Sequence, residues 1–160
     1  MTVSMKIISA ILIASAAVSA QAQTATQTVT FQVDAINQVA VTGTPTLDIN
    51  AAVAGGAPTT VTSSGNTWAV TTNQTTAKIT ASIASNMPAG LTLSATLGAP
   101  AGATSAGIKS LSTVAVDIVT GITKLNASGL SLTYQLDATS AAGVVTSATR
   151  VVTYTITGGV

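Results

Sequence analysis

The 160-residue sequence contains no cysteine, no histidine and no glutamate, and its only acidic residues are four aspartates. Without these side chains, the usual pairs of nucleophile and general base cannot be assembled. Zinc and copper lose their preferred ligands as well, and the aspartates do not follow the pattern of a calcium-binding loop. We therefore expect no enzymatic activity, no metal site and no cofactor.

Charged residues are also scarce, at 6% of the chain, whereas soluble domains have about 25%. Once the N-terminal segment described below is removed, four basic residues balance four aspartates, so the net charge is four minus four, or zero. Such a chain has no field that would attract nucleic acid or an anionic membrane. An uncharged surface of Thr, Ser, Asn and Gln also does little to keep copies of the chain apart.

The N-terminus has the features of a secretion signal. Lys6 precedes an unbroken run of small and apolar residues at 7–18, and Ala20 and Ala22 fit a signal-peptidase cleavage site. This run of 12 residues is shorter than the roughly 20 that cross a bilayer, and the lack of cysteine excludes a lipoprotein anchor. We predict a cleaved signal peptide at 1–22 and a protein secreted by a prokaryote, outside the cell or on its surface.

After the signal, short runs of alternating apolar and polar residues are separated by Gly, Pro, Asn and Ser, without helical periodicity. The runs are expected to form strands at residues 28–35, 38–42, 45–49, 66–72, 77–84, 90–97, 110–119, 130–139 and 150–157. The run at 110–119 changes its apolar phase, which indicates a bulge. About seven to nine such strands predict an all-β domain at 37–160, an antiparallel β-sandwich, with a closed barrel as the alternative.

The first of these runs is the most informative. Its apolar residues take every second position, at Val29, Phe31, Val33 and Ala35, which is typical of a strand with one buried face. The same phase resumes at residue 39, so the joint or hinge is expected at Ile36, Asn37 and Gln38. The segment 23–36 is then either a first strand that switches between the sheets of its own domain or a strand donated to another molecule.

Aromatic residues and asparagines offer few candidate binding sites. Tyr134 and Tyr154 are in phase with aliphatic residues, and Trp68 lies in an apolar strand, so all three are expected in the core and not on a sugar-binding platform. Asn73 and Asn126 each begin an Asn-x-Thr/Ser triplet at an expected turn. They are candidate glycosylation sites, with ordinary turn asparagines as the alternative.

Two stretches resemble known families. The segment LTYQLDATSAAG at 132–143, followed by RVVTYTIT at 150–157, resembles the last hairpin of an immunoglobulin-like or fibronectin-type-III-like domain. The signal peptide, the alternating N-terminal strand and the charge-poor domain together are similar to subunits of surface filaments assembled by donor-strand complementation, such as the chaperone–usher pilins. Many of these pilins carry a disulfide, which this chain cannot form.

The second resemblance implies a function. In such filaments the N-terminal segment of one subunit completes the sheet of the next, with alternate side chains inserted into a groove. Carried over to this chain, the inserted residues are Val29, Phe31, Val33 and Ala35. We therefore expect an exported structural subunit of an extracellular filament or surface assembly, with copies of itself or related subunits as partners. The alternative is a monomeric immunoglobulin-like adhesin or binding module, with specificity in the loops at 54–66 and 98–107.

Overall fold

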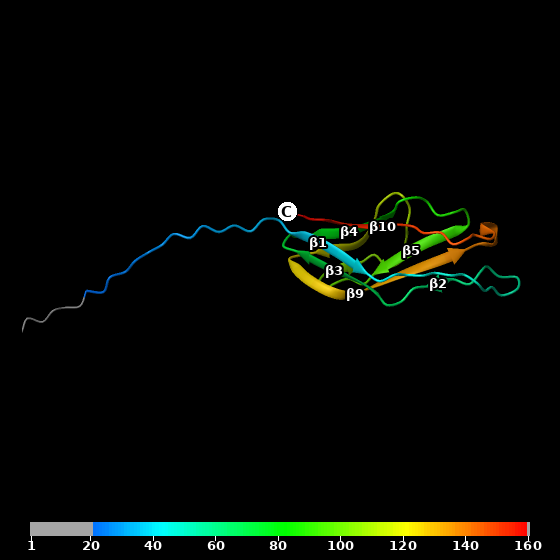
Figure 1. Ribbon diagram of the computed structural model, residues 1–160, viewed down its shortest axis with the longest axis horizontal. Coiled ribbons are helices and arrows are strands. Elements are labelled where there is room, and N and C mark those ends of the chain that lie inside the picture. Colours follow the sequence, from blue (N-terminus) through cyan, green and yellow to red (C-terminus); the bar gives the residue numbers. More distant parts are fainter. Residues whose placement is uncertain (1–20, 160) are drawn as a thin grey trace, which may run out of the picture. The chain divides into compact units, whose positions relative to one another are not determined.

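The computed structural model of the protein describes residues 21–159, and the chain divides into two units, residues 1–32 and residues 33–160 (Figure 1). Within the first unit, the described residues 21–32 are exposed and belong to no helix or strand. Apart from its last two residues, the predicted signal peptide at 1–22 lies outside the described residues. Within the described residues, no helix is long and apolar enough to cross a membrane.

The second unit is all-β and consists of two antiparallel sheets, as the sequence predicts. The strands are β1 (Asn37–Thr42), β2 (Val61–Thr62), β3 (Asn66–Thr72), β4 (Ala77–Ile83), β5 (Leu91–Leu97), β6 (Thr104–Ser105), β7 (Lys109–Ser110), β8 (Val116–Ile122), β9 (Leu125–Ala138) and β10 (Val152–Thr157). A single 3₁₀ turn, η1 (Ser140–Ala142), follows β9. The larger sheet has the order β1-β3-β9-β5-β7, with β2 also paired to β9, and the smaller sheet has the order β10-β4-β8-β6.

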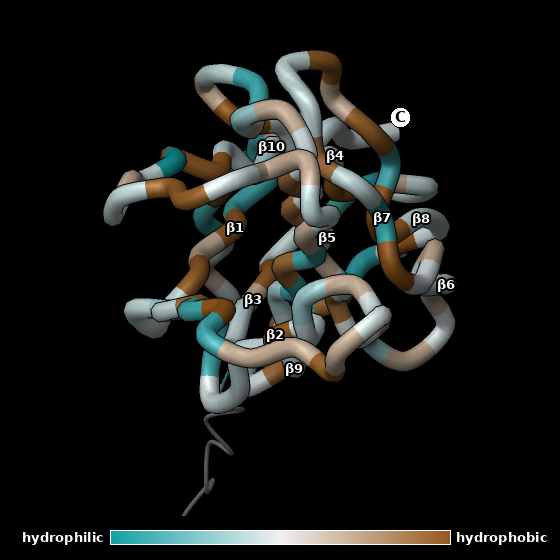
Figure 2. Tube along the Cα trace, turned by 90° about the vertical axis from the view of Figure 1, so that its right-hand side faces the viewer, coloured by the Kyte–Doolittle hydropathy of each residue, from teal (hydrophilic) through white to brown (hydrophobic). Residues whose placement is uncertain are grey.

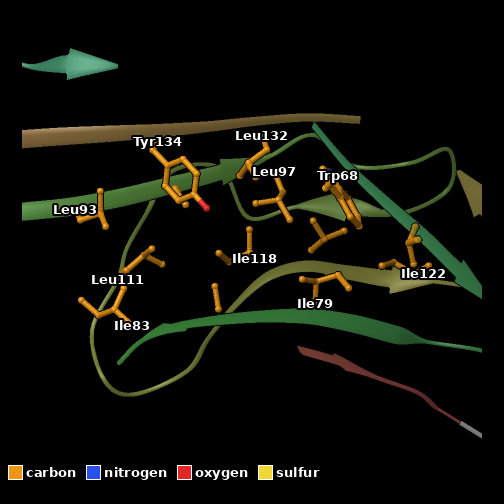
Figure 3. Close-up of a cluster of buried hydrophobic side chains, with 14 of the residues drawn as sticks. Trp68, Ile79, Ile83, Leu93, Leu97, Leu111, Ile118, Ile122, Leu132 and Tyr134 are labelled. Carbon is orange, nitrogen blue, oxygen red and sulfur yellow. The ribbon is translucent and has the colours of Figure 1, made fainter. Parts of the chain in front are cut away.

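The core lies between the two sheets, as in a β-sandwich (Figure 3). Alternate residues of β3 and of β4 are buried because successive side chains of a strand point to opposite faces. The largest of the fully buried side chains is that of Trp68, which is 1% exposed and whose Nε1 donates a 3.0 Å hydrogen bond to the carbonyl oxygen of Gly98. Burial of Trp68 and of Tyr134, which is 7% exposed, confirms that both belong to the core.

The longest strand, β9, organises the larger sheet. Its first half pairs with β3, and its second half pairs with β5 on one edge and with β2 on the other. The prediction of a turn around Asn126 is therefore wrong, because Asn126 pairs with Thr71 inside the sheet. A shift of register between Trp68 and Val70 of β3 and a positive φ of 65° at Gly129 accommodate the turn-forming residues within a continuous strand.

Two other predicted strands differ from the structure. Residues 45–49 form no strand, although Leu47 and Ile49 are half-buried, because this alternating run has no partner strand with which to form a ladder. The irregular run at 110–119 is the place where the chain passes from one sheet to the other, since β7 belongs to the larger sheet and β8 to the smaller one. The bulge that the sequence predicts in this run is confirmed: the register of β8 against β4 shifts between Asp117 and Val119, so the adjacent Ile118 and Val119 are both buried.

Candidate subunit interface

Strands β1 and β10 are edge strands of different sheets and lie next to each other along one side of the domain (Figure 1). The residue after β10 lies beside the start of β1, since a Cβ atom on Gly158 would collide with the side-chain amide of Asn37. Each strand has a neighbour on one side only, β3 for β1 and β4 for β10. The backbone N–H and C=O groups on the other side of each strand are therefore available for a further strand.

The inward side chains of these two strands are incompletely covered. Val41 of β1 is directly opposite Trp68, and opposite residues of an antiparallel pair share a face, yet Val41 is 45% exposed while Trp68 is buried. Three residues of β10, opposite buried residues of β4, are likewise only half-buried. We call this apolar strip the open edge; it consists of Val39, Val41, Val152, Tyr154 and Ile156.

Figure 2 shows hydrophobic stretches of the chain on β1 at the margin of the domain. The position of the open edge explains its exposure. A strand inside a sheet has its inward face covered by the opposite sheet and by both neighbours, whereas here neither sheet continues beyond β1 or β10. An edge strand with unpaired N–H and C=O groups on one side is a template for pairing with another chain. The open edge is therefore a candidate interface.

At one end the open edge meets a cavity of about 350 Å³. Leu93 and Leu136 line it from the larger sheet, Val152 lines it from β10, and Leu47 lines it from the segment that follows β1. Because Val152 belongs to both features, the cavity is continuous with the open edge. It offers room for an apolar side chain between the sheets.

The cavity has little electrostatic character. Among the described residues that line it, Arg150 is the only charged one, and its guanidinium donates hydrogen bonds of 3.1 and 3.3 Å to the carbonyl oxygen of Asn86 and of 2.8 Å to that of Thr149. Burial raises the pKa of the Tyr134 hydroxyl, which lies on the cavity wall, so Tyr134 is neutral at physiological pH. These features favour an uncharged, apolar occupant.

The N-terminal segment offers side chains of this kind. Val29, Phe31 and Val33 are 71%, 89% and 77% exposed, and Ala35 is exposed as well. Residues 28–35 form no strand within the described chain, contrary to the sequence-based prediction. The physical reason is that an alternating sequence becomes a strand only when a second strand takes its backbone hydrogen bonds, and among the described residues strand pairing begins at β1.

The predicted joint is shorter than expected. Asn37 and Gln38 are the first two residues of β1, opposite Thr72 and Thr71 of β3, so only Ile36 of the three lies outside a strand. Ile36 is 40% exposed, and its backbone is hydrogen-bonded to Asn73. A hinge at Ile36 stays a prediction.

The two candidate glycosylation sites come together at the same end of the larger sheet. Asn73, Asn126 and Ile36 line a second cavity, of about 480 Å³. Asn73 lies in the turn between β3 and β4, where the sequence places it, and its side chain takes part in three hydrogen bonds, two at Oδ1 and one at Nδ2. Glycosylation at either asparagine stays a prediction, whereas the bonding of Asn73 assigns it a role that the sequence does not indicate.

Chemistry beyond hydrogen bonding is sparse in the described part of the chain. No three His, Cys, Asp or Glu residues are grouped closely enough there to hold a metal ion. Asp117 forms an ion pair with Lys78, with 2.9 Å between Oδ1 and Nζ, and Asp137 accepts hydrogen bonds from Thr60 and Gln135. These two aspartates therefore have evident structural roles.

Comparison with known proteins gives no match: no protein-family model, no curated protein and no solved structure is similar to this chain. The role of the open edge is therefore inferred from its own geometry and chemistry.

Proposed function

We propose that the protein is an exported structural subunit of an extracellular filament, in which residues 28–35 of one copy add as a strand to the open edge of the next. The observation that carries this proposal is that one chain contains both halves of the contact. Three large apolar side chains are exposed at alternate positions of a segment that forms no strand, and the inward apolar residues of two edge strands are only half-buried or, for Val41, 45% exposed.

The two halves are compatible in length and chemistry. Eight residues in extended conformation span about 26 Å at 3.3 Å per residue, which exceeds the length of the six-residue strand β1. Strand addition supplies backbone hydrogen bonds along the edge and places every second side chain toward the core. Val29, Phe31, Val33 and Ala35 would then face inward, while Thr30, Gln32 and Asp34 would face solvent.

The remaining features support assembly. The chain without its signal has no net charge, so neighbouring copies would not repel one another. Contact between identical chains through two different surfaces is head-to-tail, which produces rings or open filaments. We further propose that the sandwich is of the immunoglobulin-like type because it consists of two antiparallel sheets; the expected last hairpin does not form, since β9 and β10 belong to different sheets.

The test compares residues 23–160 with a shorter chain, residues 37–160, by size-exclusion chromatography and negative-stain electron microscopy. The longer chain is expected to form filaments and the shorter one to remain monomeric, because all ten strands lie within residues 37–157 while the donor segment does not. A synthetic peptide of residues 23–36 should bind the shorter chain in calorimetry.

Two charge variants give this test its control. Phe31→Asp is expected to abolish filaments because it places a carboxylate on the apolar face, whereas Thr30→Asp adds the same charge on the opposite face and is expected to leave them intact. Monomers from all four proteins would overturn the proposal. Monomers that bind a glycan or matrix protein through loops 54–66 or 98–107 would favour the adhesin alternative.

A further inference from the structure

The side chain of Asn73 holds the backbone on which the N-terminal segment leaves the domain. Its Oδ1 accepts a 2.8 Å hydrogen bond from the N–H of Ile36, and its Nδ2 donates a 2.7 Å hydrogen bond to the carbonyl oxygen of Asp34. Its own backbone N–H donates to the carbonyl oxygen of Ile36, at 3.2 Å. Three hydrogen bonds from one residue therefore act on residues 34–36.

These bonds continue the pairing between β1 and β3 beyond the end of β3. The regular ladder ends with Asn37 opposite Thr72, and after Asn73 the chain turns into β4, with a positive φ of 52° at Thr76. The main chain of β3 thus leaves the sheet while the chain before β1 is still extended. A side-chain amide replaces the missing strand backbone because it carries both an acceptor and donors, as a peptide group does.

The choice of residue matters for this role. A carboxylate of the same shape has acceptors only, so aspartate at this position could accept from the Ile36 N–H but would face the Asp34 carbonyl with a second acceptor. Further support comes from Gln74, whose Nε2 donates a 2.7 Å hydrogen bond to Oδ1 of Asn73 and orients the amide. The hydroxyl oxygen of Thr72 accepts a 3.0 Å hydrogen bond from the backbone N–H of Gln74, which fixes the start of the turn.

We infer that Asn73 is a positioning residue of the subunit joint: it keeps the chain extended through Asp34 and so restricts the direction in which residues 28–35 reach the next copy. The expected consequence is a narrow range of angles between successive subunits of the filament, and it rests on the proposed function. Loss of the amide would release residues 34–36 and widen that range without removing any donor side chain.

The first experiment measures the joint in the monomer, because the absence of cysteine allows two specific spin labels. Thr30→Cys and Ala106→Cys would be labelled in the signal-free chain, kept monomeric by Phe31→Asp, and the label–label distance measured by pulsed electron paramagnetic resonance. Asn73→Asp and Asn73→Ala are expected to broaden the distance distribution. Asn126→Ala is the matched control: Asn126 lines the same cavity, and no hydrogen bond of its side chain is found in the described part of the chain.

The second experiment measures the angle between adjacent subunits in filaments that retain Phe31, by cryo-electron microscopy. Asn73→Asp should give filaments with a broader spread of angles than the parent and Asn126→Ala filaments, at an unchanged melting temperature. Equal distance distributions and equal angles in all variants would overturn the role of Asn73 and leave the proposed function standing. Absence of filaments from the parent chain would instead count against the proposed function, and the spin-label result alone would then decide the role of Asn73.

Discussion

The hydroxyl of Tyr154 donates a 3.0 Å hydrogen bond to the hydroxyl of Tyr134, and this bond joins the two sheets beside the open edge. Tyr134 belongs to β9 in the larger sheet, and Tyr154 belongs to β10, the edge strand of the smaller one. The pair therefore ties an edge strand to the core at the place where the sandwich is least covered. The bond uses the donor of the Tyr154 hydroxyl and leaves the Tyr134 hydroxyl able to donate.

Replacing these tyrosines should reveal the coupling between the sheets. Tyr134→Phe and Tyr154→Phe are each expected to lower the free energy of unfolding by about 0.5–1.5 kcal/mol, the usual net contribution of a hydrogen bond. The double variant should lose less than the sum of the two, because either substitution already breaks the shared bond. Urea unfolding of the four proteins measures this, and strict additivity would show that the bond contributes nothing.

Stability should also fall at high pH because of this pair. Burial raises the pKa of the Tyr134 hydroxyl. The pKa of the Tyr154 hydroxyl is raised by burial first, and then by the hydrogen bond to Tyr134 and by the charge of Tyr134. Unfolded tyrosines ionise near pH 10, so above about pH 10 the unfolded chain binds fewer protons than the folded one and the free energy of unfolding decreases. Below about pH 9 the pair should have no effect on the pH dependence. Denaturant unfolding from pH 7 to 11 tests this, and the double Phe variant should show a smaller decrease above pH 10.

Strands with one buried face are the part of this fold that the sequence predicts well. The run at 66–72 coincides with β3, and the run at 77–84 differs from β4 by one residue, because both strands lie inside their sheets and bury every second side chain. Trp68 could be assigned to the core for the same reason. An alternating sequence indicates which side chains of a strand are buried. In β3 and β4 the same face is buried along the whole strand, so the pattern predicts both strands correctly.

The position of a strand within its sheet could not be predicted, because it depends on which neighbours the chain brings to each edge. Val39 and Val41 alternate like core residues, and only the pairing order shows that they lie at an open edge. Residues 45–49 alternate too but have no partner strand. The role of Asn73 could not be predicted from the sequence either. Its partners Asp34 and Ile36 are more than 35 residues away in the sequence and are brought near by the pairing of β1 with β3.

A charge on the open edge should block assembly without unfolding the domain. Val41→Asp places a carboxylate on the apolar strip, where an inserted strand would have to desolvate it. Ile108→Asp is the matched control, since Ile108 is 53% exposed and Val41 is 45% exposed, but Ile108 lies between β6 and β7, outside the open edge. Both variants should melt within a few degrees of the parent, and only Val41→Asp should remain monomeric in chromatography. Filaments from both variants would show that the open edge is not the acceptor.

Phe31 should occupy the cavity at the end of the open edge. It is the only phenylalanine in the sequence and the bulkiest of the four alternating residues, and the cavity of about 350 Å³ between the sheets is lined mainly by apolar side chains. A benzophenone amino acid in place of Phe31, irradiated in assembled filaments, is therefore expected to form cross-links with Leu47, Leu136 or Val152 of a neighbouring copy.

The same photoreactive group in place of Thr30 points to the opposite face and should give few such adducts. Mass spectrometry of peptides from mixed isotope-labelled and unlabelled chains distinguishes cross-links between copies from those within one copy. Adducts of position 31 confined to its own chain, or to the loop that contains Val144, would place the donor segment elsewhere, because the open edge belongs to β1 and β10, each of which has a neighbouring strand on one side only.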